Sequence, residues 1–317
     1  MTPNVSVIIC TRNRADSLVP TLESIARCKV PPDMTVEVLV VDNGSTDHTA
    51  QVAAEAARTN PSIRYVNEPR SGKSYAYNQG LAASVGRALL FTDDDVRVPP
   101  DWIESMARPI LAGESDAIAG GVRIAPHLLR PWMTALHRSW LASTEYLHRT
   151  RPQEMVGANM AFGRHVLDRV PQFDPELGPG ALGQSDDQLF SLQLLRAGFT
   201  IAPRLDVECE HHFEASRLTR ASFLRMALNR GRCRAHLLHH WEHDPIDLPW
   251  LRLVHAWSKL WLLRTVLFWQ CLPREGMRQW EMQALLMFHT LRHWLRERNR
   301  SPEYGKFGLV RISSPHG

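Results

Sequence analysis

The sequence lacks the signatures of several common protein classes. Its 317 residues include five cysteines, and none of them forms a CxxC pair. An odd, scattered set of cysteines indicates reduced thiols and argues against a disulfide framework or a thiolate zinc site. The sequence has no HExxH motif, and no GxGxxG follows its first apolar run, so neither a zincin nor a dinucleotide-binding oxidoreductase is indicated.

The N-terminus also lacks the pattern of a secretory leader. An apolar run that ends at Cys10 is followed at once by Arg12 and Arg14, without a basic region before it or a small-residue cleavage site after it. We therefore expect a cytoplasmic protein.

Basic residues and tryptophans are concentrated towards the C-terminus. Residues 217–317 contain 17 Lys and Arg against 7 Asp and Glu, whereas residues 1–216 contain 20 against 26. Seven of the ten tryptophans also lie in residues 217–317. Arginine mixed with tryptophan is typical of segments at a membrane surface. No nucleic-acid motif accompanies the basic charge, so we expect no nucleic-acid partner.

Residues 248–272 are strongly apolar, but Arg252, His255, Lys259 and Arg264 interrupt them. A membrane-spanning helix needs about 20 largely apolar residues, and charges at its centre are costly. The pattern therefore predicts an interfacial helix or hairpin, in peripheral contact with the inner face of the cytoplasmic membrane. The alternative is a soluble helical cap that packs on the rest of the protein.

Apolar runs alternate with helical patterns in the first third of the chain. Residues 5–10, 36–41 and 88–91 are short apolar runs, and a helical pattern comes after each of the first two, at residues 15–26 and 46–57. This alternation predicts an α/β fold with a mostly parallel sheet covered by helices.

Polar residues come directly after each of the three predicted strands. Thr11, Arg12, Asn13 and Arg14 follow the first, Asp42, Asn43, Gly44 and Ser45 follow the second, and Asp93, Asp94 and Asp95 follow the third. The carboxyl ends of strands form the ligand crevice of open α/β sheets, so these groups should converge. Three crowded carboxylates repel one another, and a divalent cation such as Mg²⁺ or Mn²⁺ would relieve that repulsion. A solvated turn is the alternative for the aspartates.

The first two groups also have simpler interpretations. Asn43 and Gly44 suit a tight turn, and Ser45 or Thr46 could cap the following helix. Asp42 is placed to bind a nucleotide's base or ribose, or to cap that helix instead. Residues 11–14 could likewise cap the helix that is predicted to begin near Ala15.

Ser71, Gly72, Lys73 and Ser74 match only the end of a phosphate-binding P-loop. The full motif requires a glycine five positions before Gly72, where this sequence has Asn67. An NTPase is therefore not indicated, although Lys73 could still neutralise a phosphate.

Taken together, these segments resemble family 2 glycosyltransferases of the GT-A fold, over roughly residues 4–235. The order and spacing of six segments carry the resemblance: VSVIICTRNRADSL (5–18), EVLVVDNGSTDHT (37–49), RSGKSYAYNQGLAAS (70–84), FTDDDV (91–96), GANMAFGRHVL (157–167) and SDDQLF (185–190). The resemblance implies a GT-A domain at residues 1–235, and the charge and tryptophan content described above predict a separate helical, basic, Trp-rich region at residues 236–317 that could lie at a membrane interface.

The resemblance implies a pocket for a nucleotide-diphospho-sugar, with UDP as the family's commonest nucleotide. Asp93 and Asp95 fit the family's DxD motif, which binds the ribose and a Mn²⁺ or Mg²⁺ ion, and Asp94 could substitute in either role. His211 and His212 resemble a downstream histidine that completes the metal site, although histidine pairs often serve only packing. The donor-binding residues implied are Thr11, Arg12, Asn13, Arg14, Asp42, Asn43, Arg70, Gly72, Lys73, Asp93 and Asp94.

Asp186 and Asp187 stand where the family usually has Glu-Asp, and the resemblance implies that Asp187 is the general base. Adjacent carboxylates raise one another's pKa, which suits a base that works near neutral pH. Ser185 or Asp186 is expected to cap the following helix, and capping is also the alternative for Asp187. Gly157, Ala158 and Asn159 resemble the acceptor side of the pocket, with a buried strand as the alternative. Trp132 and Trp140 could cover the acceptor or only pack.

The predicted function is therefore inverting, metal-dependent transfer of one sugar to a hydroxyl of a saccharide or lipid-linked acceptor in glycan or polysaccharide biosynthesis. The processive synthases of the family carry QxxRW, whereas this chain has Asn229-Arg230-Gly231-Arg232-Cys233-Arg234. Two alternatives stay open: a catalytically inactive relative that acts as a membrane-associated binding module, and a nucleotidyltransferase. Four histidines at helical spacing, His236, His239, His240 and His243, could also bind zinc, although surface positions are the simpler interpretation.

Overall fold

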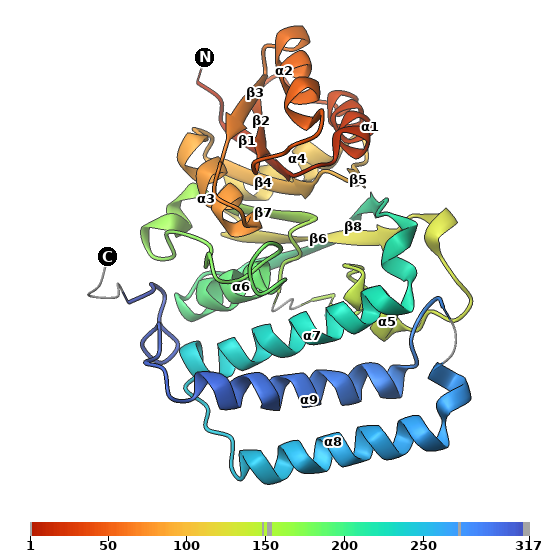
Figure 1. Cartoon of the computed structure of the whole chain (residues 1–317). Helices are drawn as coiled ribbons and strands as arrows, with labels where there is room; N and C mark the ends of the chain where they lie inside the picture. The colour runs from red at the N-terminus through yellow and green to blue at the C-terminus, as the bar shows by residue number, and fades with distance from the viewer. Residues whose placement is uncertain (1, 148, 151–153, 272–273, 313–317) are drawn as a thin grey trace.

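An eight-stranded sheet forms the centre of the molecule (Figure 1). The computed structural model describes residues 2–147, 149–150, 154–271 and 274–312. The strand order is β3-β2-β1-β4-β7-β6-β8-β5. The strands are β1 (Val5–Thr11), β2 (Val36–Asp42), β3 (Ile63–Asn67), β4 (Ala88–Asp93), β5 (Val96–Arg97), β6 (Ala117–Ile124), β7 (Asn159–Gly163) and β8 (Ile201–His211).

Most neighbouring strands of the sheet run parallel. Strands β1 to β4 form a parallel half, and β6 and β8 are also parallel to each other. Strand β7 joins the two halves by antiparallel pairing with β4 and β6, and the short β5 pairs antiparallel with β8. The predicted α/β class with a mostly parallel sheet is confirmed.

Helices cover both faces of this sheet. Helices α1 (Ala15–Ala26), α2 (Thr49–Thr59) and α4 (Trp102–Leu111) pack apolar side chains on one face, where Val5, Val7 and Ile9 of β1 point. Helices α3 (Lys73–Ala83) and α6 (Asp186–Arg196) cover the other face, where Ile8 points. The alternation of β1 side chains between two apolar layers follows from the two-residue period of a strand.

The register of the sheet brings the polar strand ends together. Thr11 lies opposite Asp42 in the pairing of β1 with β2, and Cys10 lies opposite Asp93 in the pairing of β1 with β4. The three predicted polar groups therefore lie after neighbouring strands at one edge of the sheet, as expected for parallel strands.

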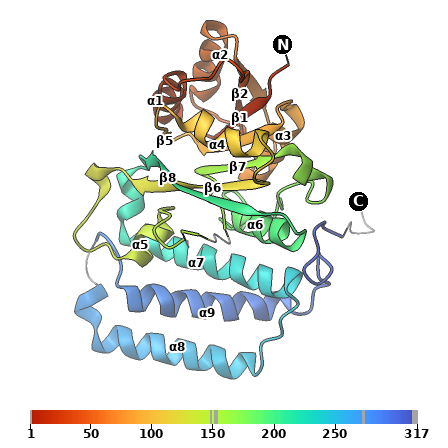
Figure 2. The same cartoon turned by 180° about the vertical axis from the view of Figure 1, so that it is seen from behind.

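Three long helices form layers on one side of the sheet (Figures 1 and 2). Helix α7 (Arg220–His236) lies nearest to the sheet, α9 (Gln279–Glu297) packs on α7, and α8 (Pro249–Val266) packs on α9. Short elements connect the rest: η1 (Pro126–Leu128), α5 (Ala135–Trp140), η2 (Arg164–Asp168), η3 (Ala215–Leu218), the π-helical η4 (Leu237–Trp241) and η5 (Phe268–Cys271).

Helix α7 belongs to both of the regions expected from the sequence. Its Phe223 and Ala227 share a core with Met282 of α9, whereas its Cys233 packs with Leu189 of α6. A boundary near residue 235 thus coincides with the end of a helix that contacts both sides, and the division into two domains stays a prediction.

The second helix begins later than predicted. Helix α2 starts at Thr49 rather than near residue 46, and neither Ser45 nor Thr46 caps it. The Ser45 hydroxyl instead accepts a hydrogen bond from the backbone N–H of Asn13, at 2.9 Å. Residues 45 and 46 are thus used to connect the ends of β1 and β2.

A glycine permits the close packing of α7 on α9. A Cβ atom added to Gly231 would lie 2.4 Å from the Cβ of His289 and 2.9 Å from the backbone nitrogen of Thr290. Cβ atoms do not approach neighbours this closely, so the two backbones meet here only because residue 231 has no side chain.

We therefore expect Gly231→Ala to lower the free energy of unfolding by about 1–3 kcal/mol, the usual cost of overpacking. At an exposed position of a helix, a change from glycine to alanine raises the free energy of unfolding by about 1 kcal/mol. A decrease in Gly231→Ala would therefore show that residue 231 is in close contact with α9. Denaturant unfolding measures the change, with Arg225→Ala on the exposed side of α7 as a control expected to stay within about 0.5 kcal/mol. A Gly231→Ala variant as stable as the parent would contradict this packing.

Candidate active site

Three aspartates lie at the end of β4, at the carboxyl edge of the sheet. Asp94 and Asp95 are buried, with 7% and 3% of their surface exposed. Three basic side chains from different elements face the cluster. The Lys73 Nζ lies 2.5 Å from Asp93 Oδ1, the Arg14 Nη1 lies 2.6 Å from Asp95 Oδ2, and the His211 Nε2 lies 3.2 Å from Asp95 Oδ1. The cluster is therefore a built electrostatic site and not a solvated turn.

The neighbouring charges separate the pKa values of these groups. Burial and the charge of Asp95 raise the pKa of Asp94 to about 7. Burial would also raise the pKa of Asp95, but His211 and Arg14 hold it far below its ordinary value. Burial opposes the charge of Lys73, yet the Asp93 carboxylate raises the pKa of Lys73 well above its ordinary value. At neutral pH the Asp95 carboxylate is therefore ionised, whereas Asp94 is poised to ionise.

Asp95 and His211 are arranged as two ligands of one cation would be. His211 ends β8, where it pairs with Val96, and this pairing brings its ring to Asp95. The His211 Nδ1 lies 3.0 Å from the carbonyl oxygen of Leu141, so a proton on Nδ1 leaves the Nε2 lone pair facing Asp95. Adjacent ligand atoms of an octahedral Mg²⁺ or Mn²⁺ ion lie about 3 Å apart. The residues present thus fit a divalent cation held by Asp95 and His211.

His212 does not belong to this group, which corrects its assignment as a possible metal ligand. Its Nε2 lies 3.1 Å from Glu210 Oε2, and its ring packs on the ring of His127. Successive side chains of a strand point to opposite faces, so His211 and His212 cannot both face Asp95.

The donor-side residues from the first strand end mostly hold the loops of the site together. The Asn13 side-chain oxygen accepts a hydrogen bond from the Thr46 backbone N–H at 2.7 Å, and Arg12 donates to the hydroxyl of Ser71. Thr11, at the end of β1, is buried beside Asp94. Arg14 is the one of these four that reaches the aspartate cluster with a charged side chain.

The side chains of Asn43 and Asp42 form hydrogen bonds within the protein. The Asn43 side chain accepts a hydrogen bond from the Gly72 N–H at 2.9 Å and donates to the carbonyl oxygen of Arg70 at 2.5 Å. Asn43 is 5% exposed, so the structure corrects its assignment as a donor-binding residue: it positions the loop that carries Lys73. Asp42 accepts from the Ser45 N–H and the Tyr65 hydroxyl and is 2% exposed, so it holds the turn after β2 and does not cap α2, which was the alternative to nucleotide binding.

The loop before α3 positions Lys73. Arg70 pairs with the buried Glu68 at 2.6 Å and lies over the ring of Tyr75. Gly72 has a φ of 138°, in a region that favours glycine, and the Lys73 N–H donates to the carbonyl oxygen of Pro179. Lys73 therefore begins α3 with its ammonium group directed at Asp93.

The second acidic group lies at the start of α6. Ser185 precedes the helix with a φ of 70° and makes no side-chain capping bond, so the expected cap by Ser185 or Asp186 is absent. Asp187 Oδ2 instead accepts a hydrogen bond from the Gly157 N–H at 2.8 Å. Burial, followed by the charge of Asp187, raises the pKa of Asp186 to about 7, and burial raises the pKa of Asp187.

Lys73 connects the two acidic groups. Its charge lowers the pKa of both Asp186 and Asp187, in opposition to their burial, while its ammonium group is paired with Asp93. Asp93 in turn acts to raise the pKa of Asp186 and Asp187. The two groups, far apart in the sequence, thus share one electrostatic environment.

The segment expected to bind the acceptor contains one residue at the site, Gly157, and one in the protein core, Asn159. A Cβ atom on Gly157 would lie 2.4 Å from the Tyr77 hydroxyl, so a glycine is needed beside Asp187. Asn159 is fully buried: its Oδ1 accepts from the Trp102 indole at 2.8 Å, and its Nδ2 donates to the carbonyl oxygens of Gly121 and Val207. The assignment of Asn159 as a sugar-binding residue is therefore corrected, and the buried-strand alternative describes it and the buried Ala158.

Two further polar side chains lie near Asp187 or interact with its charge: Tyr77, which was not assigned from the sequence, and Arg230, one of the arginines that could bind a diphosphate or lipid phosphate in place of QxxRW. Among the described residues, the Tyr77 hydroxyl is buried without a hydrogen-bond partner, and the spacing of Lys73 and Tyr77 by four residues on α3 could have indicated that both face the site. Arg230 lies over the ring of Trp140 at 5.1 Å, interacts with the charge of Asp187 and has a buried Nε that is likewise unpaired within the described chain. Buried polar atoms without protein partners at one site indicate a polar ligand.

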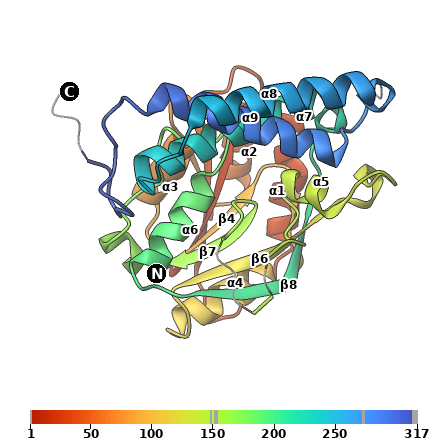
Figure 3. The same ribbon diagram turned by 90° about the horizontal axis from the view of Figure 1, so that it is seen from below.

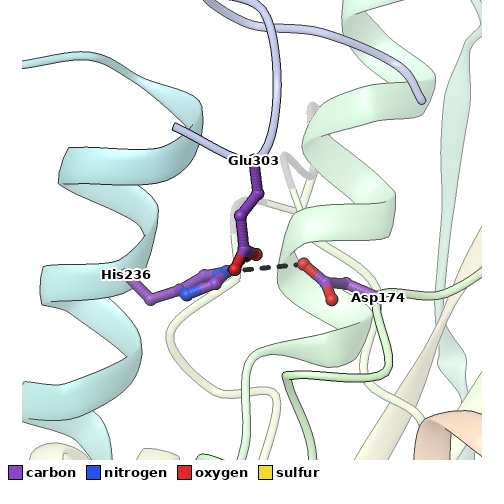
Figure 4. Close-up of side chains that lie close together, drawn as sticks. All are labelled: Asp174, His236 and Glu303. Carbon is purple, nitrogen blue, oxygen red and sulfur yellow. Dashed lines mark hydrogen bonds and ion pairs between the residues drawn. The ribbon is translucent and has the colours of Figure 1, made fainter. Parts of the chain in front are cut away.

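The histidines near the end of α7 serve another purpose. His236 lies 3.4 Å from Asp174, and one potential ligand atom each of Asp174, His236 and Glu303 lie within 4.8 Å of one another (Figure 4). Arg311 pairs with both carboxylates, at 3.5 Å from Asp174 and 2.7 Å from Glu303, and so already supplies a positive charge. Among the described residues this cluster therefore fastens the C-terminal segment.

The other three histidines also bind this segment or α9. His239 and His243 contact the carbonyl oxygens of Arg300 and Tyr304, and the Nε2 of His240 lies 3.4 Å from Glu297. His236 and His240 are buried, contrary to the expected surface positions, and the four rings do not converge on one zinc site.

Comparisons with known proteins show which family this chain resembles. The family model described as glycosyl transferase family 2 matches residues 6–169. A glucosyl-dolichyl phosphate glucuronosyltransferase of Haloferax volcanii is 25% identical over 182 residues, which cover 55% of this chain and 57% of that protein. The succinoglycan biosynthesis protein ExoM of Rhizobium meliloti is 33% identical over 124 residues, which cover 38% and 40%. The chain thus spans about half the length of these relatives.

Solved structures show the same fold. The mannosyltransferase PcManGT of Pyrobaculum calidifontis, in complex with GDP-Man and Mn²⁺, aligns with a TM-score of 0.59 and 21% identity, covering 94% of this chain and 87% of that one. This likeness confirms the expected GT-A fold.

The neighbouring histidines provide a test of the cation site. We expect His211→Ala to weaken Mn²⁺ binding, measured by calorimetry in the presence of a nucleoside diphosphate, by about tenfold or more. His212→Ala should change it less than about twofold, because the His212 ring faces Glu210. Equal effects of the two substitutions would show that the cation is not bound beside Asp95.

Proposed function

This chain belongs to glycosyltransferase family 2, and we propose that it transfers one sugar from a nucleoside diphosphate sugar to a hydroxyl group of a saccharide or lipid-linked acceptor, with inversion at the anomeric carbon. One observation carries the proposal. Lys73 is paired with Asp93 of the aspartate cluster at 2.5 Å, and its charge acts on Asp186 and Asp187. This shared electrostatic environment supports a site in which the leaving diphosphate and the attacking hydroxyl are bound close together.

The donor side suits an anionic leaving group. Departure of a nucleoside diphosphate builds negative charge, and fixed positive charges that face this group lower the barrier. Arg14 and Lys73 supply such charges from the starts of α1 and α3. A divalent cation held by Asp95 and His211 would, when bound, neutralise further charge on the diphosphate. We propose UDP as the first nucleotide to test, because the resemblance to the family favours it.

The acceptor side suits proton removal by Asp187. Its Oδ2 is held by the Gly157 N–H at 2.8 Å, which fixes the direction of the carboxylate. The proton of the acceptor hydroxyl would pass to Asp187 as the hydroxyl oxygen attacks the anomeric carbon. A single displacement with one base inverts that carbon. Because the pKa of Asp187 is raised, the base is stronger than an exposed aspartate.

Two observations support the proposed class of acceptor: the names of the relatives and an arginine of α7. The relatives named above act in glucuronosyl transfer to glucosyl-dolichyl phosphate and in succinoglycan biosynthesis, according to their names. Arg230 of α7 interacts with the charge of Asp187, and its guanidinium could bind a phosphate or a sugar hydroxyl of the acceptor. A saccharide or lipid-linked acceptor, extended by a single sugar, fits both observations.

The coupled aspartates predict a pH dependence. Asp186 and Asp187 titrate as a pair, and the raised pKa, about 7 for Asp186, means that the basic form is lost as the pH falls through this value. We expect kcat/KM for nucleoside diphosphate release to fall below about pH 7. Asp186→Asn should shift this fall to lower pH, because Asp187 then has no charged neighbour in the pair.

Asp187→Asn should lower kcat by about 100-fold or more while the dissociation constant for the donor stays within about twofold. A normal kcat in Asp187→Asn would contradict the assignment of the base. Pyrophosphate release in place of nucleoside diphosphate would indicate a nucleotidyltransferase. Metal-dependent donor binding without any release would indicate an inactive relative.

A further inference from the structure

The outward side of α8 is an exposed apolar surface. Leu260 of this helix is buried, whereas the tryptophans of the helix are between 56% and 60% exposed. Isolated exposed apolar side chains are ordinary, but ten of them close together in one segment mark an interaction surface. The surface, called here the α8 face, consists of Leu248, Trp250, Leu251, Val254, Trp257, Trp261, Leu262, Val266, Phe268 and Trp269.

The spacing of these residues makes the α8 face continuous. Trp250, Val254, Trp257 and Trp261 follow one another at intervals of four, three and four residues, which places them on one side of a helix. Helix α8 is the outermost of the three layers, with α9 between it and α7 (Figure 1), and it faces the viewer when the molecule is seen from below (Figure 3). A continuous apolar stripe on a helix is normally buried against another element, so a partner for this exposed stripe is expected.

The charges on α8 indicate what kind of partner this is. From Leu248 to Arg274 the sequence contains no Asp or Glu, but it contains Arg252, Lys259 and Arg264. Arg252 and Lys259 are exposed on the same helix, two residues after Trp250 and Trp257. A second copy of the chain would bring like charges together on this face. An anionic lipid surface offers phosphates to the basic side chains and an apolar boundary to the tryptophans.

Helix α8 is also held firmly to the rest of the protein. Arg264 of α8 donates to Glu281 of α9 at 2.8 Å, and Arg220 of α7 donates to the same carboxylate oxygen at 2.6 Å. Glu281 is fully buried, and both arginines hold its pKa below the ordinary value against the effect of burial. Breaking such a buried pair is costly, so the α8 face is a fixed part of the structure.

We propose that the α8 face docks the protein on the surface of a membrane that contains anionic lipid. Trp250, Trp257 and Trp261 enter the interface between headgroups and acyl chains, and Arg252 and Lys259 contact lipid phosphates. Among the described residues no helix is long and apolar enough to cross a membrane. The docking does not rest on the proposed sugar transfer, but it would bring a lipid-linked acceptor to the protein.

Vesicle binding tests this proposal. Full-length protein is floated with vesicles of phosphatidylcholine alone or of phosphatidylcholine with phosphatidylglycerol, and tryptophan emission is recorded. We expect binding to the anionic vesicles, with a blue shift of the emission and weaker binding at high salt. The Trp257→Ser, Trp261→Ser double variant should lose about tenfold or more in partitioning.

Two matched pairs of variants locate the effect on the α8 face. Leu262→Ser should weaken binding, whereas Leu129→Ser, which removes a similarly exposed leucine elsewhere, should not. Lys259→Glu should weaken binding to anionic vesicles more than Lys29→Glu, although both change the net charge equally. Melting temperatures show that each variant is folded, and nucleoside diphosphate release with a water-soluble acceptor should stay unchanged.

Three results would overturn the proposal. The first is no binding of the parent protein to either kind of vesicle. The second is undiminished binding of the double tryptophan variant. The third is a lipid-free dimer, seen by sedimentation, that the double variant dissociates, since the occupant of the α8 face would then be a second copy. If the parent protein binds vesicles but releases no nucleoside diphosphate, the result would count against the proposed function and not against membrane docking.

Discussion

The candidate site depends on the compensation of carboxylate charge at one edge of the sheet. Asp93, Asp94 and Asp95 are crowded together, and two of them are buried, which is unfavourable unless positive charge lies close by. The fold supplies that charge from Arg14 on the β1–α1 loop and Lys73 at the start of α3, and it places the ring of His211, at the end of β8, next to Asp95. Elements far apart in the sequence are thus positioned by one electrostatic requirement. The same charges are those that a leaving nucleoside diphosphate needs.

Helix α7 connects this site to the outer helical layers. On one side its Arg230 lies against Trp140 and interacts with Asp187. On the other side Arg220 shares the buried carboxylate of Glu281 with Arg264 of α8. A membrane-docked α8 would therefore hold Asp186 and Asp187, the proposed catalytic pair, at a fixed distance from the lipid surface. This geometry suits an enzyme whose acceptor is carried by a lipid.

Much of the sheet was predictable, because its strands and helices have clear periods. The apolar runs at residues 5–10, 36–41 and 88–91 are β1, β2 and β4, and residues 15–26 are α1. The sequence did not predict which of two adjacent polar residues faces the site. Only the pairing of β8 with β5 shows that His211 rather than His212 faces Asp95. Asn159 is bound by Trp102, Gly121 and Val207 from three other elements, and no local pattern reveals such long-range partners.

The position of a bound cation tests the central claim most directly. A crystal soaked with Mn²⁺ and a nucleoside diphosphate, with anomalous scattering recorded at the manganese edge, locates the ion independently of any assay. The account predicts a peak within ligand distance of both Asp95 and His211, with the diphosphate facing Arg14 and Lys73. A peak only at Asp174, His236 and Glu303, or a diphosphate bound away from the aspartates, would contradict it.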